Sequence, residues 1–177
     1  MPADPFDIAV AFSLGAEGRF TADPADPGNW TKGAIGAGVC RGTNFGISAA
    51  SYPTLDIAAL TREEAVAIYR RDYWDKLGCA LLPPSLALAL FDTGVNCGVG
   101  RAVEWLQKIV GVDVDGVVGP ATRSAVAARP LERVIHDFIL KRLTTYAELS
   151  RWQPYLAGWD SRVVALTLLV GKLMDGP

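Results

Sequence analysis

The sequence contains a single histidine, His136, and three cysteines, Cys40, Cys79 and Cys97, whose spacing fits no metal-ligand pattern. His136 lies in an apolar, helix-like stretch, where we expect a local partner on the same helix. The scarcity of these residue types argues against a zinc site, and against a Ser-His-Asp or Cys-His mechanism unless it depends on His136. We therefore expect neither a metal nor another cofactor.

The sequence also lacks a large excess of charge of either sign and lacks long apolar runs. The chain has 17 Lys and Arg against 19 Asp and Glu, with no basic run, which argues against a nucleic-acid partner. The most apolar tail stretch, residues 163–170, is far shorter than the ~20 residues of a membrane span. Residues 1–5 lack the features of a secretory signal. We expect synthesis in the cytoplasm without a signal peptide, no stable membrane insertion, and a monomer.

The pattern that is present is mainly helical. Half of the 177 residues are hydrophobic and a fifth are charged, enough for a sizeable core. Phe6, Val10, Leu14 and Glu17 are spaced 4, 4 and 3 apart, which predicts a helix over residues 6–17 with these side chains on one face. By contrast, residues 21–53 are rich in Gly, Pro, Asp, Thr and Ser, which predicts loops or short irregular strands.

Further helices are predicted from local start signals. Thr61 followed by Glu64 forms a capping-box pattern, which predicts a helix from Thr61 to about Leu77. Pro83-Pro84 predicts the start of another, before a glycine-rich break at residues 94–100. The remaining predicted helices cover residues 101–110, 120–128, 130–149 and 158 onward. The sequence therefore predicts a mainly α fold with one polar loop region near the start.

Glu17 is the most suggestive carboxylate, because it ends the inward face of the first predicted helix. Neighbouring Phe12, Leu14 and Phe20 supply apolar surroundings that raise a carboxyl pKa by desolvation and suit it to donate a proton. Asp26 follows nine residues later in a Pro-punctuated loop. Judged by spacing alone, two carboxylates placed in this way more often lie on the solvated surface than in a catalytic site.

Several motifs that follow one another in order support a functional interpretation of Glu17 more strongly than spacing does. With these motifs, the chain resembles the glycoside hydrolase family 108 muramidases over about residues 6–169. Two blocks resemble the family's N-terminal motif: Glu17-Gly18-Arg19-Phe20 with Asp23-Pro24-Ala25-Asp26-Pro27-Gly28, and Thr43-Asn44-Phe45-Gly46-Ile47-Ser48. Three later segments also look like this family: Tyr73-Trp74, Leu90-Phe91-Asp92 and Val95-Asn96-Cys97-Gly98. Residues 105–122 resemble its peptidoglycan-binding region.

The resemblance implies a lysozyme-like helical fold. Residues 1–95 would form the catalytic region, and residues 96–177 a helical peptidoglycan-binding region packed on it as one compact unit. It implies a cell-lysis enzyme that acts on the bacterial wall after release or export. Its partner would be the peptidoglycan glycan strand, cut at the β-1,4 bond between N-acetylmuramic acid and N-acetylglucosamine.

The same resemblance assigns roles to single residues. Glu17 would donate the proton, while Asp26 and Thr43 would position a water or stabilise the oxocarbenium-like state. The implied substrate contacts are Phe45, Tyr73 and Asn96.

Two departures from the family pattern leave alternatives open. Arg19 stands where the motif has a second glycine, and residues 29–42 look like an insertion before Thr43. Thr31 is therefore an alternative to Thr43, and Asp23 or Asp92 an alternative to Asp26. A lytic transglycosylase and a non-catalytic peptidoglycan-binding module are the competing functions.

Overall fold

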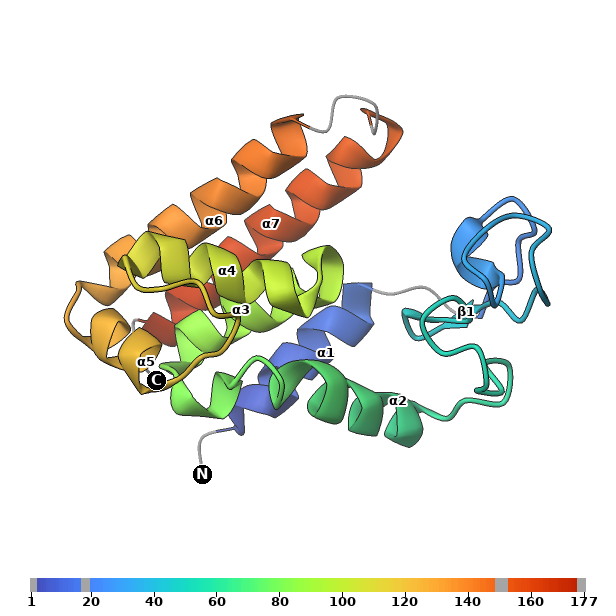
Figure 1. Ribbon diagram of the computed structural model, residues 1–177, viewed down its shortest axis with the longest axis horizontal. Helices are drawn as coiled ribbons and strands as arrows, with labels where there is room; N and C mark the ends of the chain where they lie inside the picture. Colours follow the sequence, from blue (N-terminus) through green and yellow to red (C-terminus); the bar gives the residue numbers. More distant parts are fainter. Residues whose placement is uncertain (1–2, 17–19, 149–152, 175–177) are drawn as a thin grey trace. The chain divides into compact units, whose positions relative to one another are not determined.

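The computed structural model describes residues 3–16, 20–148 and 153–174 (Figure 1). Its described residues are mainly helical with one two-stranded sheet, which confirms the predicted fold class. The chain divides into two compact units, one of residues 1–9 with 71–177 and one of residues 10–70. We call them the helical unit and the loop unit; their limits do not coincide with the sequence division at residue 95.

The helical unit is built around α3 (Pro84–Cys97), which contacts α4 (Val99–Val110), α6 (Leu131–Glu148) and α7 (Gln153–Met174). Figure 1 shows α3 at the centre, with α6 and α7 running side by side in opposite directions. A proline at its first position starts α3, as predicted, because its missing N–H leaves no donor unsatisfied there. Its core side chains Leu86, Leu90 and Phe91 are fully buried.

The predicted glycine-rich break begins too early. α3 continues through Gly94 to Cys97 and ends only at Gly98, whose φ is 94°. A Cβ on Gly94 would lie 2.7 Å from Cδ1 of Leu77, so this glycine permits close packing against a neighbouring side chain. A glycine inside a helix therefore marks a close approach here, and the sequence pattern alone does not separate that from a helix end.

An aromatic cluster anchors the beginning of α1 (Pro5–Ala16) within the helical unit. The Phe6 ring lies 5.5 Å from that of Trp74 and 6.2 Å from that of Phe91, and the last two rings are 5.7 Å apart, all edge to face. The Asp4 carboxylate accepts a hydrogen bond from the Phe6 N–H at 2.9 Å. The helix thus agrees with the predicted residues 6–17 as far as Ala16.

The short elements complete the helical unit. η3 (Cys79–Leu81) precedes α3, and α5 (Pro120–Ala127) lies between α4 and α6. α7 begins at Gln153, so Gly158 lies inside it, whereas the sequence predicted the helix from Gly158 onward. Among the described residues, no helix combines the length and apolar character needed to cross a membrane.

The loop unit contains α2 (Arg62–Tyr69) and the sheet. The capping box at the start of α2 is present as predicted: the Thr61 hydroxyl accepts from the Glu64 N–H, and the Glu64 carboxylate accepts from the Thr61 N–H. The α-helix is shorter than predicted, because the chain passes at Arg70 into a π-helical turn, η2 (Arg70–Trp74).

The predicted irregular region is confirmed as loops with very short strands. β1 (Thr43–Asn44) and β2 (Ile47–Ser48) pair antiparallel, with Thr43 opposite Ser48. A 3-10 turn, η1 (Pro27–Asn29), precedes them, and isolated bridges join Thr21 to Thr43 and Trp30 to Cys40. Residues 29–42, which look like an insertion, therefore form a loop closed at its base.

Candidate active site

Glu17, the predicted proton donor, lies outside the described residues, as do Gly18 and Arg19. The candidate site is therefore described from the polar loops that follow them in the chain, between Phe20 and Asp56. These loops all belong to the loop unit.

Two exposed aspartates shape the first loop. Asp26 caps η1, because its Oδ1 accepts a hydrogen bond from the Gly28 N–H at 2.8 Å. Asp23 makes a similar turn, with Oδ1 accepting from the Ala25 N–H at 2.9 Å. Within the described part of the chain, the second oxygen of each carboxylate makes no hydrogen bond. The turns thus hold both carboxylates in place and leave one oxygen of each available.

Asn29 is the centre of the hydrogen bonding in the loop unit, a role that no pattern in the sequence indicates. Its side chain is fully buried; Nδ2 donates to the Asp23 carbonyl at 2.9 Å and Oδ1 accepts from the Thr43 hydroxyl at 2.7 Å. Its own carbonyl accepts from the backbone N–H groups of Arg41, at 2.9 Å, and Gly42, at 3.1 Å. One residue, through its side-chain amide and its backbone carbonyl, therefore joins the aspartate loop, the base of the 29–42 loop and the first strand.

The two candidate threonines have different positions. Thr43 is half-buried, exchanges backbone hydrogen bonds of 2.8 and 2.9 Å with Thr21, and donates its hydroxyl to Asn29. Thr31 instead accepts a hydrogen bond from the Val39 N–H at 3.0 Å and closes the loop of residues 29–42. Thr43 and Asp23 thus meet at Asn29, whereas Thr31 faces its own loop.

Phe45 occupies a strained position in the turn between β1 and β2. Phe45 and Gly46 have φ values of 51° and 75°, the combination that a two-residue type I′ turn requires. Among the described residues, Phe45 is the single non-glycine with positive φ, a conformation that bulky side chains disfavour. The Tyr69 hydroxyl donates to the Phe45 carbonyl at 3.0 Å and holds the turn. Strain retained in this way is common at ligand-binding positions.

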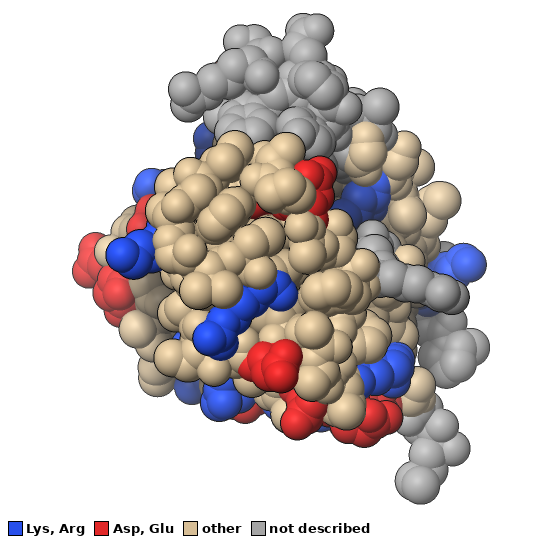
Figure 2. All heavy atoms as spheres, turned by 90° about the vertical axis from the view of Figure 1, so that its right-hand side faces the viewer, with Lys and Arg blue, Asp and Glu red and all other residues tan. Residues whose placement is uncertain are grey.

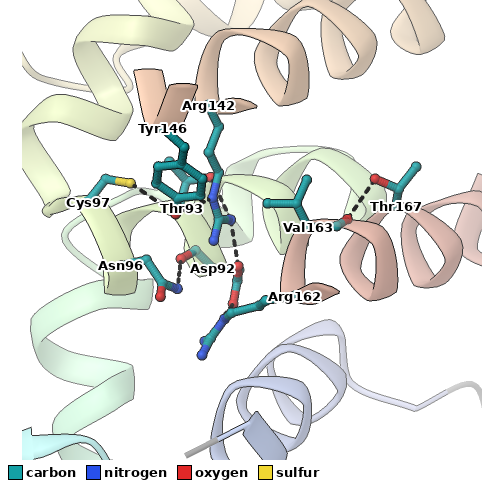
Figure 3. A network of polar contacts seen from close by, with 9 residues as sticks. All are labelled: Asp92, Thr93, Asn96, Cys97, Arg142, Tyr146, Arg162, Val163 and Thr167. Carbon is teal, nitrogen blue, oxygen red and sulfur yellow. Dashed lines mark hydrogen bonds and ion pairs between the residues drawn. The ribbon is translucent and has the colours of Figure 1, made fainter. Parts of the chain in front are cut away.

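Tyr73 and Asn96, the other predicted substrate contacts, belong to the helical unit. Tyr73 is half-buried in the π-helical turn η2. Asn96 is exposed near the end of α3, and its Nδ2 donates to the Asp92 carbonyl at 2.7 Å (Figure 3). This bond leaves the Asn96 amide oxygen available to a donor.

Asp92, one alternative to Asp26, lies in a buried network (Figure 3). Arg142 donates to its Oδ2 at 2.6 Å, and Arg162 donates to its Oδ1 at 2.8 and 3.0 Å. Burial raises the pKa of Tyr146 to about 12, and its neutral hydroxyl accepts from Nε of Arg142 at 2.8 Å. Both oxygens of Asp92 are thus engaged by structural partners.

An open pocket of about 430 Å³ in the loop unit is lined by side chains that include Phe20, Arg41 and Asp56. Figure 2 shows a face of the molecule on which most of the surface is uncharged and charged side chains are scattered. In the described ranges, no group of three or more His, Cys, Asp or Glu gathers in a way that could hold a metal ion.

Comparison with known proteins places these features in a family. Residues 10–98 match the model of glycosyl hydrolase 108. The chain belongs to this family. Residues 101–164 match the model of a predicted peptidoglycan domain. Together the two matches support a lysozyme-like peptidoglycan hydrolase as the general function of this family 108 chain.

A solved structure shows the same fold. The structure of Brucella abortus SagA is 32% identical in sequence, with a TM-score of 0.78; the match covers 93% of this chain and 92% of that chain. No curated protein matches the chain significantly.

Proposed function

We propose that this family 108 chain is an N-acetylmuramidase that hydrolyses the β-1,4 bond between N-acetylmuramic acid and N-acetylglucosamine, with Glu17 as the general acid. The observation that carries the proposal is the Asn29 centre, which fixes the loops that follow Glu17 in the chain. It holds the Asp23–Asp26 turns and the Thr43 hydroxyl in one compact unit. Such positioning is what a hydrolase needs beside its acid.

The proposed reaction divides between two carboxyl groups. Glu17 gives its proton to the glycosidic oxygen as the bond to the anomeric carbon breaks. The Asp26 oxygen that accepts no hydrogen bond from the described residues accepts a proton from the water that attacks that carbon. The Thr43 hydroxyl helps to position this water, because its oxygen can still accept a hydrogen bond while it donates to Asn29. The product is a chain with a reducing end.

The remaining predicted residues are assigned to substrate contact and domain organisation. Phe45, at its strained turn, is proposed to contact a sugar ring, and Tyr73 and Asn96 to contact the glycan from the helical unit. We retain residues 1–95 as the catalytic region and residues 96–177 as the region that holds peptidoglycan. The family models, over residues 10–98 and 101–164, support this division.

Turbidity measurements test the role of Glu17. Purified protein should clear a peptidoglycan suspension, and Glu17→Gln should lower the rate by roughly a thousandfold or more, because an amide has no proton to give. The melting temperature should stay nearly unchanged. The matched control is Glu63→Gln, the same change at an exposed position of α2, which should keep full activity. A Glu17→Gln variant that clears the suspension at the normal rate would refute the assignment.

Mass spectrometry of the released fragments tests the reaction type. Hydrolysis leaves reducing ends, whereas a lytic transglycosylase leaves 1,6-anhydro ends. Asp26→Asn should slow hydrolysis without changing the melting temperature, because the amide oxygen still accepts from the Gly28 N–H. Anhydro products would replace the muramidase proposal with a transglycosylase. Sedimentation of the wild-type protein with peptidoglycan, with no loss of turbidity, would replace it with a binding module.

A further inference from the structure

The pocket of about 430 Å³ in the loop unit has no role in the reaction described above. Three segments that are separate in sequence form it, and Phe20, Cys40, Arg41, Thr54 and Asp56 are among its lining residues. Arg41 and Cys40 come from the end of the 29–42 loop, the segment that departs from the family pattern. Part of the pocket lining is therefore supplied by this loop.

Phe20 forms an apolar wall of the pocket. Gly42 has a φ of 86°, and a Cβ there would lie 2.8 Å from Cε2 of Phe20 and would clash with the Thr21 carbonyl. The Phe20 ring thus lies directly against the backbone of Gly42, a position that only glycine permits. Even so, 46% of the Phe20 residue surface remains exposed, so the ring is held in place and still open to a ligand.

Arg41 and Asp56 place opposite charges in the same pocket. The Arg41 N–H donates to the carbonyl of the buried Asn29 at 2.9 Å, which fixes its backbone. In the described part of the chain, the Arg41 guanidinium makes no hydrogen bond or ion pair, and it does not pair with Asp56. Asp56 uses one carboxylate oxygen to accept from the Ala59 N–H at 3.3 Å, and its other oxygen accepts no hydrogen bond from the residues that the structure describes. Both charges are available to a bound molecule.

We infer that this pocket binds the peptide stem of peptidoglycan, at an amino acid that carries both a carboxylate and a free amine. The Arg41 guanidinium receives the carboxylate in a two-pronged hydrogen bond, the Asp56 carboxylate receives the ammonium, and the aliphatic part lies on Phe20. Peptide stems that contain a diamino acid carry these groups. The inference rests on the proposed function, because it takes peptidoglycan as the substrate.

Calorimetric titration of a soluble stem peptide tests the inference. The probe is L-alanyl-γ-D-glutamyl-meso-diaminopimelyl-D-alanine, alongside one derivative with its carboxylates amidated and one with its side-chain amine acetylated. Arg41→Gln should weaken binding of the free peptide about tenfold, the usual size for one charged hydrogen-bonded contact. It should leave the binding of the amidated peptide unchanged. Asp56→Asn should behave in the same way towards the acetylated peptide, since its amide oxygen still accepts from Ala59.

Lys32→Gln is the matched control, because Lys32 is exposed in the same loop and does not line the pocket. It should bind all three peptides like the wild type. Equal weakening by Lys32→Gln and Arg41→Gln would show attraction by net charge alone and overturn the inference. Equal wild-type affinity for the three peptides, or no binding at millimolar concentration, would also overturn it.

The failure of this inference can be told apart from the failure of the proposed function. Peptide binding needs no bond cleavage, so Glu17→Gln should bind the stem peptide like the wild type. A protein that cleaves peptidoglycan but does not distinguish the peptides refutes the pocket alone. A protein that distinguishes the peptides but does not cleave peptidoglycan refutes only the proposed reaction.

Discussion

The two units of this chain are stabilised in different ways. In the helical unit, α3 is covered by α4, α6 and α7, and residues such as Leu86, Leu90 and Phe138 are fully buried. In the loop unit, buried amides replace much of that apolar packing. Asn29 forms hydrogen bonds with three segments of the chain. Nδ2 of Asn44 donates to the carbonyls of Ile57, at 3.2 Å, and Leu60, at 3.4 Å.

Backbone hydrogen bonding explains the difference. A helix satisfies its own N–H and C=O groups, so its side chains are left to pack against each other. Irregular chain must find a partner for each buried polar group, and asparagine offers a donor and an acceptor in one short side chain.

The carboxylates show what this means for function. Asp92 is buried in the helical unit and saturated by two arginines, whereas Asp23 and Asp26 are exposed on loops that buried amides hold in place. An irregular region with a polar core can therefore present carboxylates to a substrate in fixed positions. Substitutions in each unit test this contrast.

Asp92→Ala should cause the largest loss of stability. Burial acts to lower the pKa of the Arg142 guanidinium, but its interactions with Asp92 and Tyr146 together outweigh burial and raise the pKa, so Arg142 stays charged. Removing Asp92 leaves that charge buried without a carboxylate. We expect a loss of about 3–5 kcal/mol, or roughly 10 °C in melting temperature by calorimetry.

Arg162→Ala sharpens the test, because it removes one of two partners and the Arg162 side chain is 11% exposed against 1% for Arg142. Arg162→Ala should lower the free energy of unfolding clearly less than Asp92→Ala does. Equal losses, or a loss below about 1 kcal/mol for Asp92→Ala, would show that the network does not stabilise the helical unit in this way.

Gly42→Ala should disturb the loop unit. The backbone at this position is left-handed, with a φ of 86°, which costs an alanine about 1–2 kcal/mol, and the new Cβ would also push Phe20 and Thr21 away. We expect a total loss of about 2–3 kcal/mol in denaturant unfolding. Gly36→Ala is the matched control: its φ is 77°, but a Cβ there meets nothing within 4 Å. If both variants lose the same stability, close packing at Gly42 contributes nothing.

Glu64→Gln tests the start of α2 through its pH dependence and should have the smallest effect. Hydrogen bonds from the backbone and then the side chain of Thr61 hold the pKa of Glu64 below its ordinary value of 4.5. The ionised carboxylate therefore stabilises the folded state above about pH 4.5, and this contribution is lost as the pH falls through the lower, folded-state pKa. The difference in melting temperature between wild type and Glu64→Gln should shrink as the pH falls from 6 to 3. A constant difference would contradict the prediction.

The parts of the fold that the sequence predicted well depend on neighbours in the chain. The capping box of Thr61 and Glu64 and the proline start of α3 are local signals, and both elements begin where these signals place them. The predictions failed where a distant contact decides. Gly94 lies inside α3, where the absence of a Cβ allows Leu77 to pack closely, and the sequence shows only a glycine.

The candidate site divides in the same way. The sequence alone determined the helical fold class, the polar loop region and the motifs that place this chain in family 108. Which polar groups meet depends on tertiary structure: Thr43 meets Asn29 across 14 residues, and Asp92 meets Arg142 across 50. The physical reason is that helix periods and caps arise within a few residues, whereas a buried polar group takes its partner from whichever segment the fold brings beside it.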